Sequence, residues 1–275
     1  MKKKLITLIY PPSFDGRKIY RKFIDNKKYK IIGFVDSMIE NKRLYKKKIF
    51  HISKIKNIYF DQILTGGRYH KSIIKKLNTY KIPNNKIKLL PKRDFDFSKK
   101  ELSLREKSIK RILNLLLNIL NKNQIWFSFE ASSLLAIIRR VPLGKFSDVD
   151  ILLNKFFSNL LIKNLSKNKN LKIKKKFLIY NNKRILYKIH LSSKIKKIYE
   201  EPVVIDIDLI SRDKKGFYKY FLGKKIYLNN CFNELIAKKY NQNKIYIPCR
   251  YQKYLKSLYG KNWLIPDDFF TVKDF

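Results

Sequence analysis

The sequence predicts two domains, an α/β domain with a parallel sheet followed by an α+β domain. The chain has 275 residues, which is more than one small domain needs. In its first third, short apolar runs alternate with helical patterns. In the remainder, paired aspartates lie inside two apolar runs. We place the boundary in the aperiodic stretch Pro91–Lys100, which gives domains of residues 1–92 and 99–275.

The first domain is predicted from strands and helices that follow one another in turn. A parallel sheet with helices packed on it is the usual result of this alternation. The expected strands cover residues 5–10, 29–35, 61–65 and 86–90, and the expected helices cover residues 17–25 and 69–80.

Two phrases of this region, KYKIIGFVD and FDQILTGG, resemble the Rossmann-like domains attached to glycan-assembly enzymes. Asp36 follows Gly16 by 20 residues, a spacing at which an acidic residue can hold a ribose hydroxyl. The phosphate-binding glycines are missing, however. Pro11 and Pro12 lack N–H donors, and Asp15 adds a negative charge where a pyrophosphate would lie. We therefore expect a degenerate Rossmann-like scaffold or docking module, and leave open whether it binds a ligand.

The second domain is predicted to open with a long helix. Ser98 and Glu101 form a capping-box signature, S-x-x-E. Apolar residues then recur with helical spacing, which we interpret as a face buried in the core. These residues are Leu104, Ile109, Ile112, Leu113, Leu116 and Leu120.

The next informative run is Asp148-Val149-Asp150, followed by Ile151-Leu152-Leu153. Two aspartates separated by one residue on a strand point to the same face. The apolar flank indicates a buried strand, where unpaired carboxylates would be costly. A cation removes that cost, and carboxylate oxygens suit Mg²⁺ or Mn²⁺. The pattern therefore predicts a divalent metal site.

A second acidic strand is predicted at residues 203–210. Asp206 and Asp208 alternate there with valine, isoleucine and leucine. A third carboxylate on a strand next to Asp148 and Asp150 would complete the metal site or accept a proton. Spacing alone does not choose between Asp206 and Asp208.

These motifs, in this order, resemble the LicD/fukutin-like phosphotransferases, a branch of the nucleotidyltransferase fold. The family pattern is a small-residue turn followed by Leu-Leu, a basic pair, an Asp-x-Asp strand and a second acidic strand. The matching residues here are Ser132-Ser133-Leu134-Leu135-Ala136, Arg139-Arg140, Asp148-Val149-Asp150, Ile207–Asp213, Pro248, Tyr254-Leu255 and Tyr259-Gly260. This alignment favours Asp208 as the third carboxylate. Ser132 and Ala136 stand where the family has glycine, and Arg140 stands where it has histidine.

The resemblance implies an enzyme that moves a phospho-substituent, such as phosphocholine or an alditol phosphate, from a CDP-linked donor to a sugar hydroxyl of a glycan. By this resemblance, the metal ligands are Asp148, Asp150 and Asp208, with Asp206 as the alternative. Arg139, Arg140, Ser132 and Ser133 would bind the phosphates, although a salt bridge from Arg139 to one of the aspartates is an equal alternative. A nucleotidyltransferase that makes an activated sugar or alcohol is the second interpretation.

The charge balance provides a third interpretation, a non-catalytic binder of nucleic acid or a membrane surface. The chain carries 64 Lys and Arg against 21 Asp and Glu, a net charge of +43. The lysines are spread along the chain, as on a solvated surface. We therefore expect no specific nucleic-acid partner. A hydrophobic fraction of 45% is ample for buried cores.

The remaining signals exclude several classes of protein. Cys231 and Cys249 form no C-x-x-C pair, which argues against a zinc site or disulfide scaffold. The histidines, His51, His70 and His190, lack metal-ligand spacing and are interpreted as ordinary. No apolar run reaches the roughly 18 residues of a membrane span. We expect a cytoplasmic protein, or one at the inner face of the membrane beside a lipid-linked glycan.

Overall fold

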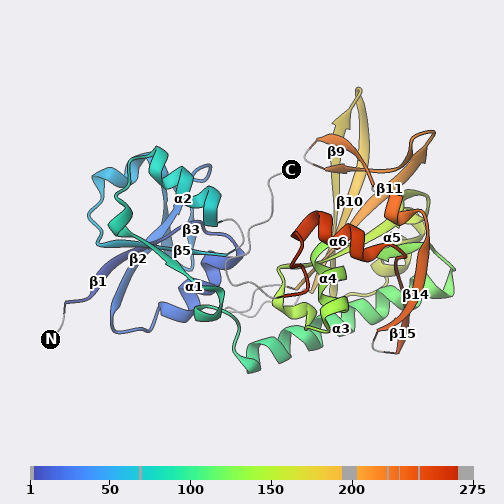
Figure 1. The fold of residues 1–275 in the computed structure, drawn as a ribbon, viewed down its shortest axis with the longest axis horizontal. Coiled ribbons are helices and arrows are strands. Elements are labelled where there is room, and N and C mark those ends of the chain that lie inside the picture. The colour runs from blue at the N-terminus through green and yellow to red at the C-terminus, as the bar shows by residue number, and fades with distance from the viewer. Residues whose placement is uncertain are drawn as a thin grey trace. The chain divides into compact units, whose positions relative to one another are not determined.

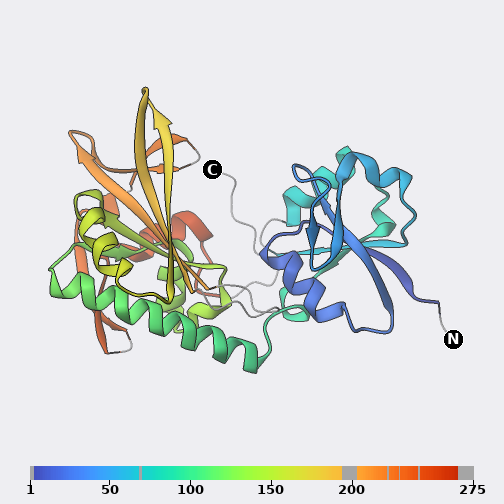
Figure 2. The same ribbon diagram turned by 180° about the vertical axis from the view of Figure 1, so that it is seen from behind.

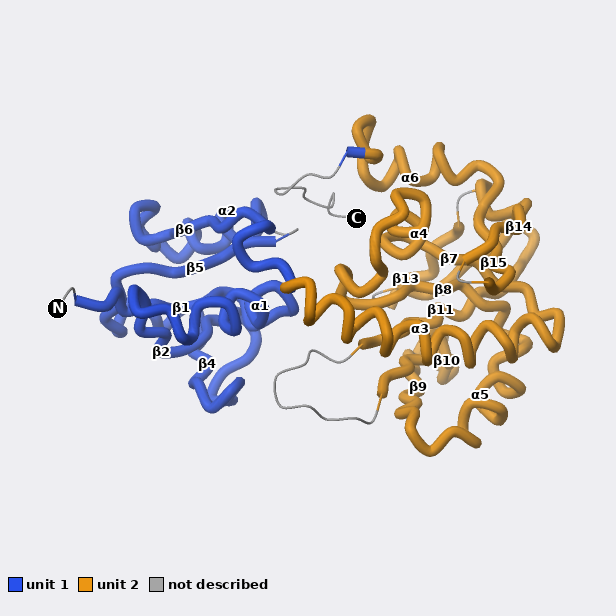
Figure 3. Tube along the Cα trace, turned by 90° about the horizontal axis from the view of Figure 1, so that it is seen from below, with its two compact units in different colours: residues 1–97, 265–275 blue, residues 98–264 orange. Residues whose placement is uncertain are grey.

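The computed structural model describes residues 3–67, 70–193, 203–221, 223–228, 230–240 and 242–265. The chain divides into two compact units, coloured separately in Figure 3. Unit 1 holds the described residues up to Phe97 together with Ile265, and unit 2 holds the described residues of the range Ser98–Leu264. The division lies within the predicted boundary stretch, residues 91–100.

Unit 1 contains the predicted parallel sheet, with helices α1 and α2 packed on it (Figure 1). Its strand order is β3-β4-β2-β1-β5-β6, and every pairing except that of β3 with β4 is parallel. Leaving out β3, this order matches the first five strands of the 3-2-1-4-5-6 order of the doubly wound Rossmann sheet. The elements are β1 Leu5–Ile9, α1 Phe14–Phe23, β2 Tyr29–Asp36, β3 Arg43–Leu44, β4 Lys47–His51, η1 Ile52–Asn57, β5 Gln62–Gly66, α2 His70–Thr79, η2 Asn84–Lys86, β6 Ile87–Leu90 and η3 Lys92–Asp94.

Sequence patterns did not predict β3 and β4, because most of their residues are polar and only Ile49 is buried. Helix α1 also begins three residues before the expected start, since Ser13 caps it by accepting the Gly16 N–H at 3.5 Å. The loop before α1 is closely packed. A Cβ on Gly16 would lie 1.8 Å from the Pro11 carbonyl oxygen, so glycine is required there.

Asp36, which has the spacing of a ribose ligand, is used in a local turn. Its Oδ1 accepts the backbone N–H groups of Met38 at 2.7 Å and Ile39 at 2.9 Å. Asp15 pairs with Lys18 at 3.1 Å, and Lys18 is only 2% exposed. Both predicted acidic features of this region therefore have partners within unit 1.

Unit 2 is built on a mixed seven-stranded sheet among the described residues. Strands β13-β12-β11-β10-β9 are antiparallel neighbours, β8 pairs with β11 in parallel, and β7 pairs with β8. The elements are α3 Lys99–Lys122, β7 Phe127–Phe129, α4 Ala131–Arg139, η4 Leu143–Lys145, β8 Asp148–Asn154, η5 Lys155–Phe157, α5 Ser158–Ser166, β9 Leu171–Tyr180, β10 Lys183–Ser193, β11 Val204–Asp213, β12 Gly216–Phe221, β13 Lys224–Tyr227, η6 Asn230–Phe232, β14 Leu235–Tyr240, β15 Asn243–Pro248 and α6 Tyr251–Tyr259.

Helix α3 runs along the sheet of unit 2, as Figure 2 shows. The predicted capping box is confirmed: Ser98 N–H donates to Glu101 Oε2 at 2.8 Å, and Glu101 N–H donates to Ser98 Oγ at 3.2 Å. The predicted stripe is buried from Ile109 to Leu120, whereas Leu104 is 36% exposed and lies outside the core. The stripe thus packs one side of α3 into the core beneath the site.

None of the helices in the described part of the chain is both long and apolar enough to cross a membrane.

Candidate metal and catalytic centre

The register of two strands positions the acidic residues of the site. Strands β8 and β11 run in parallel, and Asp150 pairs directly with Asp206. On each strand the alternate residues, such as Val149 and Ile205, are fully buried in the core. The core therefore holds the backbone, and strand alternation presents the carboxylates on the opposite face.

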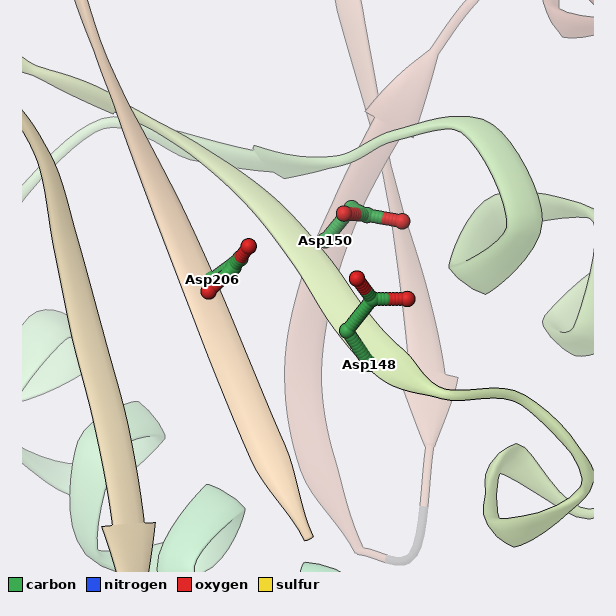
Figure 4. A group of neighbouring side chains, drawn as sticks. All are labelled: Asp148, Asp150 and Asp206. Atoms are coloured by element: carbon green, nitrogen blue, oxygen red, sulfur yellow. The ribbon is translucent and has the colours of Figure 1, made fainter. Parts of the chain in front are cut away.

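Asp148, Asp150 and Asp206 form a cluster suited to a metal ion (Figure 4). Each offers one carboxylate oxygen, and these oxygens lie within 4.8 Å of one another. Oxygen ligands from three carboxylates match the preference of Mg²⁺ and Mn²⁺. The cluster could therefore hold a divalent cation, as the sequence predicted for Asp148 and Asp150.

The electrostatics of Asp150 also fit a cation. Burial raises the pKa of Asp150 well above its ordinary value, and the negative charges of Asp148, Glu130 and Asp208 raise it further. The positive charge of Lys188 lowers this pKa only in part. Like charges that crowd a buried carboxyl disfavour ionisation, and a bound divalent cation reverses this effect.

Asp206, and not Asp208, completes this cluster. The alignment with the LicD pattern favoured Asp208, but the register places Asp208 beside Leu152, one step further along the strand. Asp206 is held by two side chains of β10: Lys188 Nζ lies 2.9 Å from Oδ2, and His190 Nδ1 lies 2.8 Å from Oδ1. The geometry of the described residues thus favours Asp206, the alternative ligand, over Asp208.

The same two side chains determine the charge of Asp206. Burial by itself would raise the pKa of Asp206. The hydrogen bond from His190 and the positive charge of Lys188 outweigh burial and lower the pKa below its ordinary value. Asp206 is therefore ionised and oriented, as a metal ligand must be.

Asp208 lies between two lysines instead. It is 6% exposed, with Oδ1 at 3.0 Å from Lys188 Nζ and Oδ2 at 2.9 Å from Lys219 Nζ. Lys219 also reaches the two Glu130 carboxylate oxygens, at 2.6 and 2.8 Å. The Tyr254 hydroxyl donates to Glu130 Oε1 at 3.2 Å. These buried groups form a second, internally paired set of charges beside the metal cluster.

Four residues of this network were not anticipated from the sequence: Glu130, Lys188, His190 and Lys219. One signal could have found two of them. Lys188 and His190 alternate on a strand, as the aspartates do, and so face the same way. Glu130 and Lys219 meet across 89 residues, and no local pattern encodes that contact.

Ser132 and Ser133, which the motif predicted to bind phosphates, both contact Asp150. Ser132 Oγ donates to Asp150 Oδ2 at 3.1 Å, and Ser133 Oγ accepts the Asp150 backbone N–H at 2.7 Å. The position that favours glycine is not Ser132, however. Ala131, the first residue of α4, has φ of +48°, a left-handed conformation that costs a residue with a Cβ.

Arg139 and Arg140 lie at the other end of α4, about 10 Å from Ser132 along the helix axis. The Arg139 guanidinium donates to the backbone carbonyl of Trp263. Burial lowers the pKa of Arg139, and the nearby Tyr259 partly offsets this. Arg140 is exposed and caps the helix with φ of +55°. The structure therefore separates the basic pair from the serines and aspartates with which it was predicted to act.

Comparison with known proteins gives weak structural likenesses only. No protein-family model matches the sequence. No curated protein matches it either. A lincosamide antibiotic adenylyltransferase, LnuA, shares 15% identity over 58% of this chain and 85% of its own, with a TM-score of 0.36. A nucleotidyltransferase-like protein from Paracoccidioides brasiliensis shares 10% identity over 55% and 62% of the chains, with a TM-score of 0.30.

A third structure is named as a dehydrogenase from Bordetella bronchiseptica RB50. It shares 9% identity over 75% of this chain and 61% of its own, with a TM-score of 0.25. Likenesses at these TM-scores assign neither a family nor a function. The function must be inferred from the side chains of the site.

Proposed function

We propose that this chain is a metal-dependent transferase of the nucleotidyltransferase fold, acting at the phosphate groups of a nucleotide-linked substrate. The observation that carries the proposal is the group of Asp148, Asp150 and Asp206 oxygens within 4.8 Å of one another. Carboxylates on neighbouring strands that converge in this way are suited to a cation that bridges phosphate oxygens.

In its finer form, the proposal is transfer of a phospho-substituent from a CDP-linked donor to a hydroxyl of a cell-surface glycan or its precursor. This form is supported by the order of motifs shared with the LicD/fukutin-like pattern. The acceptor would be met in the cytoplasm, or at the inner face of the membrane if it is lipid-linked.

The residues of the chain have distinct tasks in this mechanism. Asp148, Asp150 and Asp206 would hold Mg²⁺ or Mn²⁺, which when bound neutralises charge on the phosphates of the donor. Ser133 fixes the backbone of Asp150, and Ser132 hydrogen-bonds its carboxylate. Lys188 and His190 keep Asp206 ionised and in place. The hydroxyl of the acceptor would then attack phosphorus in line with the leaving nucleotide.

The first test is Mn²⁺ binding by the purified chain, measured by calorimetry and by thermal shift with CDP, CTP, UDP and ATP. We expect stabilisation by a cytidine nucleotide only when Mn²⁺ is present. The variant D150N should lose Mn²⁺ binding by at least about tenfold, since it removes a charged ligand of the cluster. D213N, which changes an aspartate of the neighbouring strand β11 outside the cluster, is the control.

Product analysis separates the two catalytic candidates. Release of CMP from a CDP-linked donor indicates transfer of a phospho-substituent, whereas release of pyrophosphate from CTP indicates nucleotidyl transfer. If Mn²⁺ binds D150N as tightly as the unmodified chain, the assignment of the metal site is wrong. If no nucleotide shifts the transition with or without metal, the transferase proposal is wrong.

A further inference from the structure

Three rows of paired residues lead from the site carboxylates to strand β9, at the edge of the sheet. Directly paired residues on neighbouring strands share a face. The lysines that end the rows therefore lie on the same face as the carboxylates. The rows are Asp148, Val204, Ser192 and Lys172; Asp150, Asp206, His190 and Lys174; and Leu152, Asp208, Lys188 and Lys176.

The lysines of β9 are not distributed evenly over the two faces of the strand. The face shared with the carboxylates has lysine at three of five positions: Lys172, Lys174 and Lys176, followed by Leu178 and Tyr180. The opposite face has lysine only at Lys175, among Leu171, Ile173, Phe177 and Ile179. We call Lys172, Lys174 and Lys176 the β9 lysine row. All three are exposed, and among the described residues none forms an ion pair.

The sequence around the row is unusual even for this basic chain. From Ile151 to Tyr199 there is no aspartate or glutamate, although the chain has 21 acidic residues in all. No acidic side chain of β9 or β10 can therefore neutralise the row. The positive charge of the row is therefore available to a ligand. The row lies two strands away from Asp206 on β11, a distance of about 10 Å.

The geometry of group transfer indicates which of the two substrates, donor or acceptor, would lie near the β9 lysine row. The start of α4, where Ser132 contacts Asp150, lies on the β7 side of β8, and helix N-termini favour phosphate groups. The donor phosphates fit on that side. An attacking hydroxyl must approach from the side opposite the leaving group. For a donor placed at α4, this is the side of β11, β10 and β9.

We propose that the β9 lysine row binds phosphate groups carried by the acceptor, so that the acceptor substrate is itself a phosphorylated, anionic molecule. This inference rests on the proposed function for the identity of the acceptor. The binding site itself requires only the row. Exposed lysines also protect edge strands from pairing with other chains, and such a role would require no ligand. The two roles differ in what the lysines bind.

The test uses the full chain without metal, in EDTA, so that it is independent of the carboxylate site. The probe is inorganic pyrophosphate, with binding measured by calorimetry at low salt. The variant K172Q/K174Q/K176Q is compared with K163Q/K169Q/K175Q, which removes three exposed lysines from the same acid-free segment. We expect about tenfold weaker binding for the first variant and less than about twofold change for the second. D150N should bind pyrophosphate as the unmodified chain does.

Several outcomes would overturn the proposal. Equal weakening in both triple variants would show a general effect of charge, and absence of pyrophosphate binding would show that the row holds no phosphate. Much tighter, row-dependent binding of a short oligouridylate would assign the row to nucleic acid instead. Vesicles with and without phosphatidic acid distinguish a lipid-borne phosphate from a free one. If the unmodified chain binds pyrophosphate but does not bind Mn²⁺, the proposed function is refuted but the phosphate site at the row is not.

Discussion

At the scale of single residues, Lys188 is the side chain on which the centre depends most directly. Its ammonium group lies 2.9 Å from Asp206 and 3.0 Å from Asp208, and it is only partly exposed. Its single positive charge is shared by the partly buried Asp206 and the buried Asp208. Asp208, which the strand register places one step beyond the cluster, has a second ammonium partner in Lys219.

We expect K188M to destabilise unit 2 by about 3 kcal/mol, because it removes a cation that two carboxylates share in a largely buried site. Mn²⁺ should restore more stability to this variant than to the unmodified chain, since the metal replaces part of the lost charge. Urea unfolding with and without Mn²⁺, followed by tryptophan fluorescence, measures both effects. K183M, on the same strand but at an exposed position, is the control. An equal loss in the two variants would contradict the role of Lys188.

Ala131 is a second residue with a clear prediction. Its φ of +48° costs a residue with a Cβ about 1–2 kcal/mol, whereas glycine adopts it freely. Part of the gain is offset because glycine has a more flexible unfolded state. We expect A131G to raise the free energy of unfolding by up to about 1 kcal/mol. The control A136G, inside the same helix, should lower it by about 1 kcal/mol or more. A loss of stability in A131G would disprove strain at this position.

At the scale of elements, the carboxylate of Asp213 at the end of β11 links this strand to β13. Asp213 accepts from Lys225 at 2.5 Å and from the Tyr227 hydroxyl at 2.8 Å, so β11 is tied to β13 across β12. The hydrogen bond from Lys225 is the main cause that lowers the pKa of Asp213 from 3.8 to about 2.

The lowered pKa of Asp213 makes the stability of the folded chain depend on pH, because the folded and unfolded states bind protons differently. A carboxyl with a lowered folded-state pKa binds protons more readily when unfolded. Its stabilising contribution is therefore complete above about pH 4 and is lost as the pH falls toward about 2. We expect D213N to melt at a slightly lower temperature than the unmodified chain at neutral pH, with the difference vanishing in acid. Melting curves of both chains from neutral pH into acid, at low salt, measure this. A difference that persists in acid would contradict the mechanism, and D25N is the control.

At the scale of the whole molecule, each unit has its own hydrophobic core. One core cluster of unit 2 joins α3, β7, β8 and β11. Two further clusters lie within unit 1. Both tryptophans, Trp126 and Trp263, belong to unit 2. Their fluorescence therefore reports the unfolding of unit 2 alone, whereas far-ultraviolet circular dichroism reports both units.

We expect the two signals to give different unfolding transitions in the full chain, because units with separate cores unfold independently. Residues 98–265 expressed alone should keep the tryptophan transition of the full chain and its shift with Mn²⁺. Coincident transitions in the full chain, or failure of residues 98–265 to fold, would show that the two units depend on each other.

Local sequence determined the main elements of unit 1, the start of α3 and the face on which the acidic residues of unit 2 lie. Short apolar runs predicted β1, β2 and β5, alternation of aspartates with apolar residues predicted β8, and the capping box predicted the start of α3. These features depend on neighbours a few residues apart, so a linear pattern contains them. The same patterns missed β3 and β4, whose residues are mostly polar, and gave no prediction for β9, β10 and β12 to β15.

Only the tertiary structure decided which acidic residues act together. Asp206 and Asp208 have the same local pattern, and the register of β11 against β8 distinguishes them by placing Asp206 beside Asp150. The partners of Glu130 and Arg139 are likewise 89 and 124 residues away in the chain. Strand register and long-range contacts depend on how the whole core packs. The alternation of polar and apolar residues within a single strand does not determine which residue of the neighbouring strand it pairs with.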